Sequence, residues 1–106
     1  MGNKRIEVVS ESMFYTLMAF LYGEYSGAEI ASIVEKLTKG RVRLGPATLY
    51  TILGRFEEEQ ILMETRTDGR KRIYRITDKG IQMYHDEHER LVQCLADAAA
   101  WEEESK

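Results

Sequence analysis

The chain of 106 residues carries a formal net charge of −3, and 43% of its residues are hydrophobic and 31% charged. This composition is typical of a globular protein with one domain, or one domain with an appended element, and excludes a disordered chain. No apolar run approaches the roughly 18 residues that span a bilayer, and the N-terminal residues lack the apolar core of a secretory signal. The single cysteine, Cys94, cannot form an intrachain disulfide, which fits a cytoplasmic location.

The net charge hides an uneven distribution along the chain. Residues 86–106 contain seven acidic and two basic side chains, whereas the preceding 85 residues contain 13 basic and 11 acidic ones. Basic residues cluster at 39–43 and again at 66–75. Because local clusters, more than the total charge, set the field that a phosphate backbone meets, the acidic total does not exclude nucleic-acid binding.

The first predicted helix spans about residues 10–22. Its apolar residues at helical spacing are Phe14, Leu17, Met18 and Leu21, and the opposite face is apolar as well. A helix that is apolar on all sides must be covered on more than one side, and in so small a domain a second chain is the natural cover. We therefore place these four residues in a predicted dimer interface.

Two further helices follow. Ser26 with Glu29 three residues later is the capping-box pattern that begins a helix, and Gly40 is expected to close that helix. After a short basic connector, Pro46 suits the first position of the third helix. The predicted buried stripe of this third helix is Leu49, Ile52, Leu53 and Phe56. Its outward face then offers Thr48, Thr51 and Arg55, with Tyr50 near the edge.

A hairpin and a long helix complete the chain. Two β-prone runs, 61–67 and 72–77, flank Asp68-Gly69, a dipeptide typical of tight hairpin turns. Thr77 or Asp78 is expected to cap the last helix, which should run to about Trp101. Along it, the 3-4 spacing of a coiled-coil seam joins Ile81, Tyr84, His88, Leu91, Leu95 and Ala98. A seam this short could pack on its own domain, but it extends past a three-helix core and favours dimerisation.

Three helices followed by a hairpin predict a winged helix-turn-helix, an α+β fold that is mainly α. We expect residues 1–77 to form a DNA-binding domain and residues 78–106 a C-terminal dimerisation helix. The third helix would present Thr48, Tyr50, Thr51 and Arg55 to bases and phosphates in a major groove. The hairpin, or wing, would hold the DNA backbone with Arg70, Lys71 and Arg72.

From Met13 to Gly80 the sequence resembles the PadR family of bacterial transcription regulators, in the compact form with a single C-terminal dimerisation helix. The matching segments are 26–30, 47–50, Leu53 with 56–59, and 69–80, and the last is the most specific, a basic wing leading into Tyr-x-x-Thr-x-x-Gly. The resemblance implies a homodimer whose C-terminal helices pack against the partner's first helix. It also implies binding to palindromic operators, usually to repress, with Tyr50 as a DNA contact, and it leaves open a small-molecule inducer.

The sequence departs from the family pattern at two positions. Ala28 stands where the family often has an aromatic residue, so the contacts with an operator near this point are less well defined. Gln60 stands where the family favours glycine, which predicts a different turn at the end of the third helix.

Other kinds of site are weakly indicated. His85 and His88 can share a helix face, but Cys94 is rotated away from them, so the three or four convergent ligands that zinc needs are missing. Cys94 also lacks a neighbouring base and an oxyanion site, so neither catalysis nor a cofactor is predicted.

Trp101 raises the question of a ligand, because some PadR-like regulators bind flat aromatic drugs between tryptophans of their dimerisation helices. The position matching that tryptophan is about Leu91, and Trp101 lies near three turns later, so we interpret Trp101 as an anchor of the dimer. The alternative function is a winged helix that binds a protein or a ligand without binding DNA.

Overall fold

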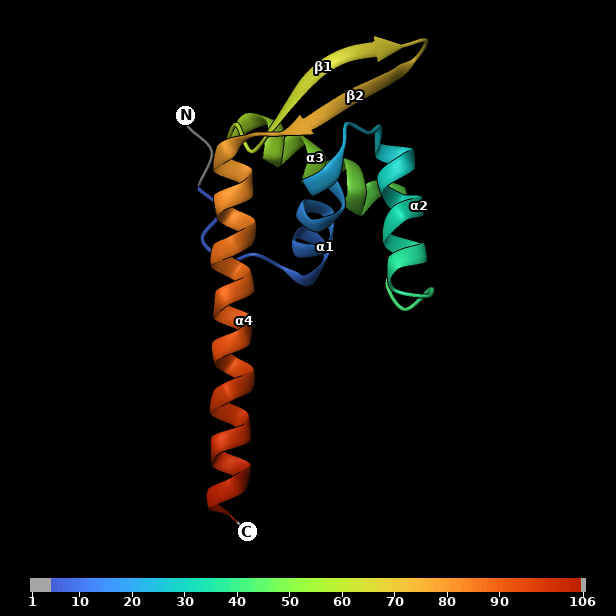
Figure 1. Cartoon of the computed structure of the whole chain (residues 1–106). Coiled ribbons are helices and arrows are strands. Elements are labelled where there is room, and N and C mark those ends of the chain that lie inside the picture. Colours follow the sequence, from blue (N-terminus) through green and yellow to red (C-terminus); the bar gives the residue numbers. More distant parts are fainter. Residues whose placement is uncertain (1–4, 106) are drawn as a thin grey trace.

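The computed structural model describes residues 5–105, and Figure 1 shows a compact head of helices and a hairpin from which one long helix projects. In chain order the elements are α1 (Glu11–Ala19), the short 3-10 helix η1 (Phe20–Tyr22), α2 (Gly27–Leu37), α3 (Pro46–Glu58), β1 (Leu62–Asp68), β2 (Lys71–Ile76) and α4 (Asp78–Glu104). This order confirms the predicted winged helix-turn-helix, with β1 and β2 as the wing.

Polar side chains begin three of the helices by accepting hydrogen bonds from backbone N–H groups that the helix leaves unpaired. The Ser10 hydroxyl accepts from Met13 N–H, and the Thr77 hydroxyl accepts from Gly80 N–H. At α2 the predicted capping box is present, since Ser26 Oγ accepts from Glu29 N–H at 3.3 Å and Glu29 Oε1 accepts from Ser26 N–H at 2.9 Å.

The ends of α2 and α3 differ from prediction. Lys39 and Gln60 both adopt left-handed backbone conformations, with φ of 54° and 61°. At the end of α3, Ile61 N–H donates to Phe56 O and Gln60 N–H donates to Glu57 O, which is the Schellman motif. The expectation of a different turn at Gln60 was therefore wrong, because glutamine adopts the conformation that glycine would adopt more easily. After α2, Lys39 takes the left-handed position, and Gly40, which was predicted to close the helix, is left-handed as well, with φ of 80°, and donates its N–H to Glu35 O at 2.8 Å.

The core joins all the elements of the head. The predicted buried stripe of α3 is confirmed, since Leu49, Ile52, Leu53 and Phe56 are each at most 5% exposed. Leu37, at the end of α2, does not join this core, since its side chain is 52% exposed. The remaining core side chains come from every other part of the head, namely Leu17, Ala19, Phe20, Ile30, Val34, Val42, Leu44, Ile61, Leu62, Tyr74 and Ile76.

The wing is attached to the helices by a backbone pair that sequence patterns did not reveal. Tyr25, between η1 and α2, forms an isolated antiparallel bridge with Tyr74 of β2. Tyr25 N–H donates to Tyr74 O at 3.0 Å, and Tyr74 N–H donates to Tyr25 O at 2.9 Å. The connector before α2 therefore acts as a one-residue third strand, which fixes the wing beside α2.

The Thr-x-x-Gly sequence explains how α4 joins the wing. Thr77 N–H donates to Ile61 O at 3.0 Å, so the chain entering α4 is bonded to the chain entering β1. Gly80 lies so close to this strand that an added Cβ would stand 2.6 Å from Ile61 O. Only glycine allows this approach, which sets where α4 leaves the head.

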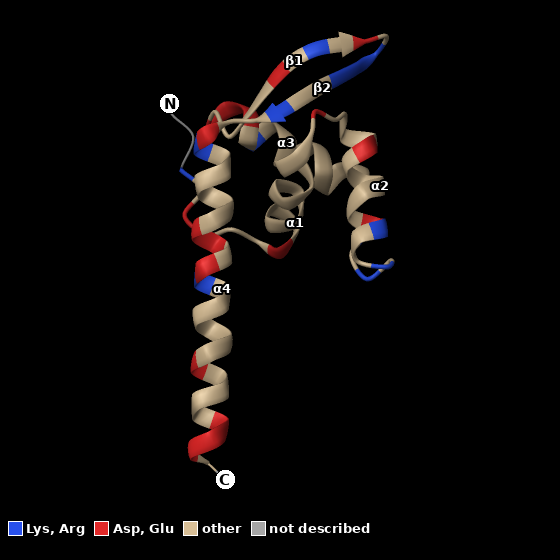
Figure 2. Cartoon of the chain, viewed as in Figure 1, with Lys and Arg blue, Asp and Glu red and all other residues tan. Residues whose placement is uncertain are grey.

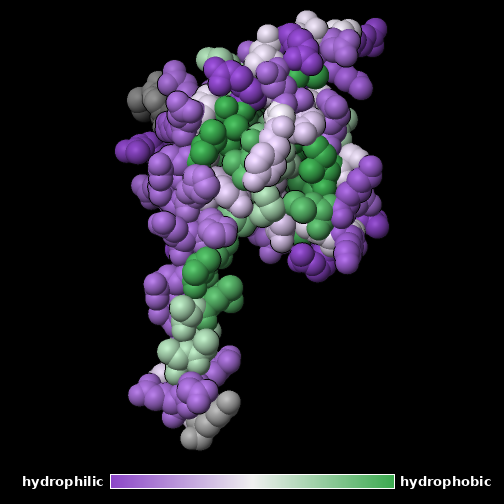
Figure 3. Space-filling model, viewed as in Figure 1, coloured by the Kyte–Doolittle hydropathy of each residue, from purple (hydrophilic) through white to green (hydrophobic). Residues whose placement is uncertain are grey.

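The two halves of α4 have different surroundings. Ile81 and Tyr84 are half-buried against the core, and the Tyr84 ring stacks on Phe14 of α1 with centroids 5.2 Å apart. Beyond Leu91 every residue is exposed, and the helix continues alone (Figure 1). In Figure 3 apolar residues form a continuous band along this projecting part. No helix among residues 5–105 has both the length and the apolar character needed to cross a membrane.

Candidate nucleic-acid interface

The N-terminal half of α3 presents polar and aromatic side chains to the surface. Thr48, Tyr50 and Thr51 are exposed, and Tyr50 is 60% exposed despite its large apolar ring. They lie outside the buried stripe because Leu49, Ile52 and Leu53 turn the other side of the helix toward the core. The predicted outward placement of Thr48 and Thr51 is confirmed, and Tyr50, predicted near the edge of this face, is exposed as well.

The wing brings cations beside this part of α3. Asp68 pairs with Lys71 across the turn, which leaves Gly69, at φ of 64°, and Arg70 at the tip. Figure 2 shows Lys and Arg concentrated at the tip end of β2, and Asp and Glu at the far end of α4. Among residues 5–105, the Arg70 and Lys71 side chains form no ion pair or hydrogen bond, so both cations are available to an anionic partner.

Between the wing and the helices lies a hollow of ≈ 280 Å³, which we call the wing hollow. Its lining comes from the start of α2, from α3 and from β2 with its turn: Ser26, Gly27, Ala28, Tyr50, Arg70, Lys71, Arg72 and Tyr74. At α2, Ala28 contributes only a methyl group to the lining of the hollow, where the family often has an aromatic side chain. The hollow therefore joins aromatic and cationic side chains of three elements on one face.

Two ionisable groups beside the wing hollow have shifted pKa values. Burial raises the pKa of the Tyr74 hydroxyl above its usual value. The hydrogen bond from Ser26 N–H lowers the pKa of the Glu29 carboxyl, with Lys71 and Arg66 adding smaller effects. The negative charge of Glu29 is thus committed to capping α2.

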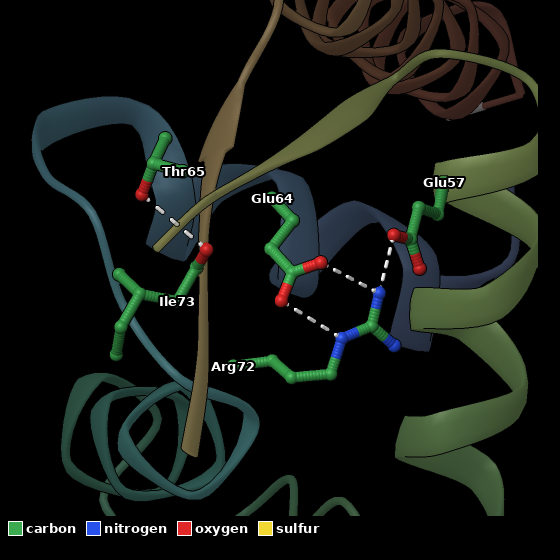
Figure 4. A network of polar contacts seen from close by, with 5 residues as sticks. All are labelled: Glu57, Glu64, Thr65, Arg72 and Ile73. Carbon is green, nitrogen blue, oxygen red and sulfur yellow. Dashed lines mark hydrogen bonds and ion pairs between the residues drawn. The ribbon is translucent and has the colours of Figure 1, made fainter. Parts of the chain in front are cut away.

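Arg72 is placed differently from its neighbours at the tip. Its guanidinium bonds Glu57 Oε2 of α3 at 2.5 Å and both carboxylate oxygens of Glu64 on β1 at 3.2 Å (Figure 4). The hydrogen bond to Glu64 raises the pKa of Arg72 above its usual value. The sequence grouped Arg72 with Arg70 and Lys71 as a DNA contact, whereas in the structure its charge is engaged within the protein.

Arg55 also differs in its surroundings from Thr48 and Thr51. It lies about one turn beyond Thr51 on α3, is half-buried, and approaches Glu59 Oε2 at 3.6 Å. Glu59 Oε1 accepts a hydrogen bond from Ile6 N–H at 2.9 Å, so this region also holds the N-terminal segment. Arg55 is therefore at the distant edge of the candidate interface.

The residues predicted at a dimer interface fall into three groups. Leu17 is 0% exposed and belongs to the core of its own chain, so it offers no surface to a partner. Partly exposed around the α1–α4 contact are Phe14, Met18, Leu21, Ile81 and Tyr84. Along the rest of α4, Leu91 is half-buried and His88 exposed, while Leu95 and Trp101 are 72% and 71% exposed.

Other chemistry finds little support in the described part of the chain. Residues 5–105 contain no group of three or more His, Cys, Asp or Glu side chains arranged to hold a metal ion. Cys94 is exposed on α4, with Arg90 Nη1 at 3.7 Å from its sulfur.

The family described as "Transcriptional regulator PadR-like family" matches residues 9–86. The chain belongs to this family. Among curated proteins no match was found.

Solved structures agree in fold. A transcriptional regulator from Clostridium thermocellum is 23% identical with a TM-score of 0.70, over 86% of this chain and 97% of its own. Bacillus subtilis PadR, solved in complex with operator DNA, is 25% identical with a TM-score of 0.62, over 72% of this chain and 46% of its own. H. salinarum RosR is 18% identical with a TM-score of 0.66, over 91% of this chain and 98% of its own. The predicted family and fold are confirmed.

Proposed function

We propose that this PadR-like regulator is a homodimer that binds palindromic operator DNA and represses transcription. The observation that carries the proposal is the gathering, on one face, of the exposed start of α3 and the unpaired cations of the wing tip. The B. subtilis relative solved with operator DNA supports the same use of the fold. A cytoplasmic location is part of the proposal.

In this proposal α3 enters the major groove, whose width of about 12 Å admits a helix. Thr48, Tyr50 and Thr51 are at its N-terminal end, the part of a recognition helix that contacts base edges. Arg70 and Lys71 at the wing tip contact the phosphate backbone, which gives affinity without sequence information. Arg55, turned toward Glu59, lies at the margin and contributes less.

The second copy would be held by the projecting half of α4 and by the exposed part of α1. Leu91, Leu95 and Trp101 lie on the projecting half, where isolated exposure of large apolar groups in water is unfavourable. Packing with a second chain would bury them and fix the two α3 helices about 34 Å apart, one turn of DNA. Residues 78–106 then serve dimerisation, with Trp101 as an anchor. Release by a small-molecule inducer remains a prediction from the family resemblance.

Salt dependence of binding tests the DNA proposal. The protein is titrated, by fluorescence anisotropy, onto a duplex from the promoter upstream of its own gene and onto a random duplex. Removing one cation that binds a phosphate lowers the slope of log K against log salt by about one. Because a homodimer carries two wings, R70A/K71A removes four such cations per dimer, and we expect it to lower the slope by about four on both duplexes.

The matched control is R75A/K79A, which removes the same charge from the base of the wing and from α4. We expect it to leave the slope nearly unchanged. An equal effect of the two double variants would show that only overall charge matters. Failure of the wild-type protein to bind the promoter or genomic fragments at low salt would favour a protein-binding or ligand-binding role.

A further inference from the structure

The wing contains a β-bulge that separates two arginines. Glu64 pairs with Tyr74, but Arg66 pairs with Ile73, so Thr65 is an extra residue in β1. In a regular ladder Arg66 would stand directly opposite Arg72, an unfavourable pair of like charges. The bulge instead puts Thr67 opposite Arg72 and lets Arg66 bond Glu24 at 2.9 Å.

Because of the bulge, Arg66 does not share the face of the wing that carries Arg72. On that face Arg72 forms an ionic cluster with Glu57 and Glu64. Figure 4 shows the Arg72 side chain between Glu64, on the neighbouring strand, and Glu57, on α3. Nη2 of Arg72 contacts both carboxylates, Nε contacts Glu64, and the guanidinium carbon lies 5.2 Å from the centre of the Tyr74 ring. Arg72 therefore has partners on β1, β2 and α3, and the cluster as a whole carries one net negative charge.

We propose that Arg72 is a positioning residue, which fixes the wing at its angle to α3 through Glu57 and Glu64, and that it makes no phosphate contact. Nε and Nη2 of Arg72 bond two carboxylates, and its guanidinium lies near the Tyr74 ring, a geometry that lysine cannot reproduce. The Tyr25–Tyr74 pair and the Glu24–Arg66 pair hold the wing to the start of α2. The ion pair of Arg72 with Glu57 links the wing to α3.

This inference rests on the proposed function, since positioning is useful when wing and α3 must meet one DNA duplex together. Association loses affinity when a contacting element has to be ordered on binding. A wing held by Arg72 keeps the tip cations Arg70 and Lys71 at a set distance from Tyr50 across the wing hollow.

The variant Glu57→Gln distinguishes positioning from direct contact by the sign of its effect. If Arg72 contacted a phosphate, removing the competing carboxylate would free its charge and strengthen DNA binding. If Arg72 positions the wing, Glu57→Gln weakens its anchor, and binding falls by about fivefold, the equivalent of the roughly 1 kcal/mol of a well-formed exposed ion pair. Tighter or unchanged binding by Glu57→Gln would overturn the inference.

Salt slopes provide the second discriminating measurement. Arg72→Ala and Arg72→Lys should weaken binding with the slope unchanged, whereas Arg70→Ala should lower the slope by about two, one for each wing of the dimer. Combining Glu57→Gln with Arg72→Ala should weaken binding no further than Arg72→Ala alone, because the two residues act together. A slope lowered by Arg72→Ala and kept by Arg72→Lys would identify Arg72 as a phosphate contact.

Amide hydrogen exchange of the DNA-free protein keeps the inference testable if DNA binding itself fails. Arg72→Ala and Glu57→Gln should speed exchange in β1 and β2 but not in α1, while Arg70→Ala should change neither. Equal exchange in all variants would show that the cluster does not hold the wing. Wild-type protein that binds no DNA would contradict the proposed function alone.

Discussion

The two halves of α4 are parts of one continuous helix but have different physical support. In the first half, Ile81 and Tyr84 pack on the core, and Glu87 is only 8% exposed. In the second half, Val92, Leu95 and Trp101 are 54%, 72% and 71% exposed. A helix without tertiary packing is marginal in water, and most helical stability in proteins comes from an amphipathic face that is covered.

A single apolar stripe along α4 thus serves two purposes. The first part of the stripe completes the head of its own chain. The second part extends beyond anything in the described chain that could cover it, which is the physical basis for proposing a second copy. Substitutions in each half of α4 distinguish these roles.

Acidic substitutions in the second half of α4 should separate the two chains of the proposed dimer. We expect Leu91→Glu with Leu95→Glu to give a monomer by analytical ultracentrifugation, because carboxylates cannot be buried in an apolar seam without a partner. Operator affinity should fall by about 100-fold or more, since two linked half-site contacts become two independent ones.

The matched control is Gln93→Glu with Ala100→Glu, which adds the same charge on another face of the same helix. It should remain dimeric. If the seam variant is also dimeric, with an unchanged circular dichroism spectrum, the second half of α4 is not the dimer contact.

Damage to the first half should instead affect folding of the head. In the monomeric background, Tyr84→Ala removes the ring stacked on Phe14 and should lower the free energy of unfolding by about 2 kcal/mol, less than a fully buried aromatic because Tyr84 is half-buried. Urea denaturation measures this change. Tyr22→Ala is the control, because Tyr22 is 91% exposed, and it should change stability little. Equal losses for both would contradict the packing assigned to α4.

A smaller effect is expected at the turn between α3 and the wing. Gln60→Gly should stabilise the head by about 0.5–1 kcal/mol, because relief of the left-handed conformation exceeds the added chain entropy of glycine. Gln60→Ala keeps the strain and should give no such gain. The thermal midpoint of the monomeric variant is the measurement, and a loss of stability with glycine would argue against the strained turn.

The smallest effect concerns pH at the boundary between the halves of α4. Two hydrogen bonds from Arg90, at 2.6 and 2.9 Å, lower the pKa of Glu87 below its usual value of 4.5. The stabilisation is therefore complete above about pH 4.5 and is lost as pH falls through the lowered pKa. Its size should be below about 1 kcal/mol, because Arg90 is largely exposed.

Glu87→Gln should remove this part of the acid sensitivity. Urea unfolding at pH 7 and at pH 3 would then show a smaller difference for Glu87→Gln than for the wild type. A difference of the same size in both proteins would exclude Glu87 as a source of acid sensitivity.

The local features of the fold could be read from the sequence. The capping box at Ser26, the stripe of α3 and the hairpin depend on residues a few positions apart, and all three occur. The turn itself is displaced by one residue, since Asp68 ends β1 by pairing with Lys71 and the turn is formed by Gly69 and Arg70. The start of α3 and the tip of the wing were also identified, because exposure follows from the same periodicity.

The missed features depend on contacts between distant segments. Arg72 looked equivalent to Arg70 because nothing near it in the sequence shows that Glu57 and Glu64 converge on its guanidinium. The bulge at Thr65 was also missed, because the alternation of polar and apolar residues in β1 is too short to show that one residue is inserted. Leu17 was assigned to the dimer interface because helical periodicity does not distinguish a residue buried in the core of its own chain from one buried against a second chain.

The Tyr25–Tyr74 pair has a consequence for folding order. The helices and the hairpin close over short stretches of chain, and such elements form within microseconds. Tyr25 and Tyr74 are separated by almost half the chain, so their pairing must wait for a large loop to close. We therefore expect the wing to be formed early but oriented late, so that the face carrying Tyr50 and Arg70 is the last part of the head to mature.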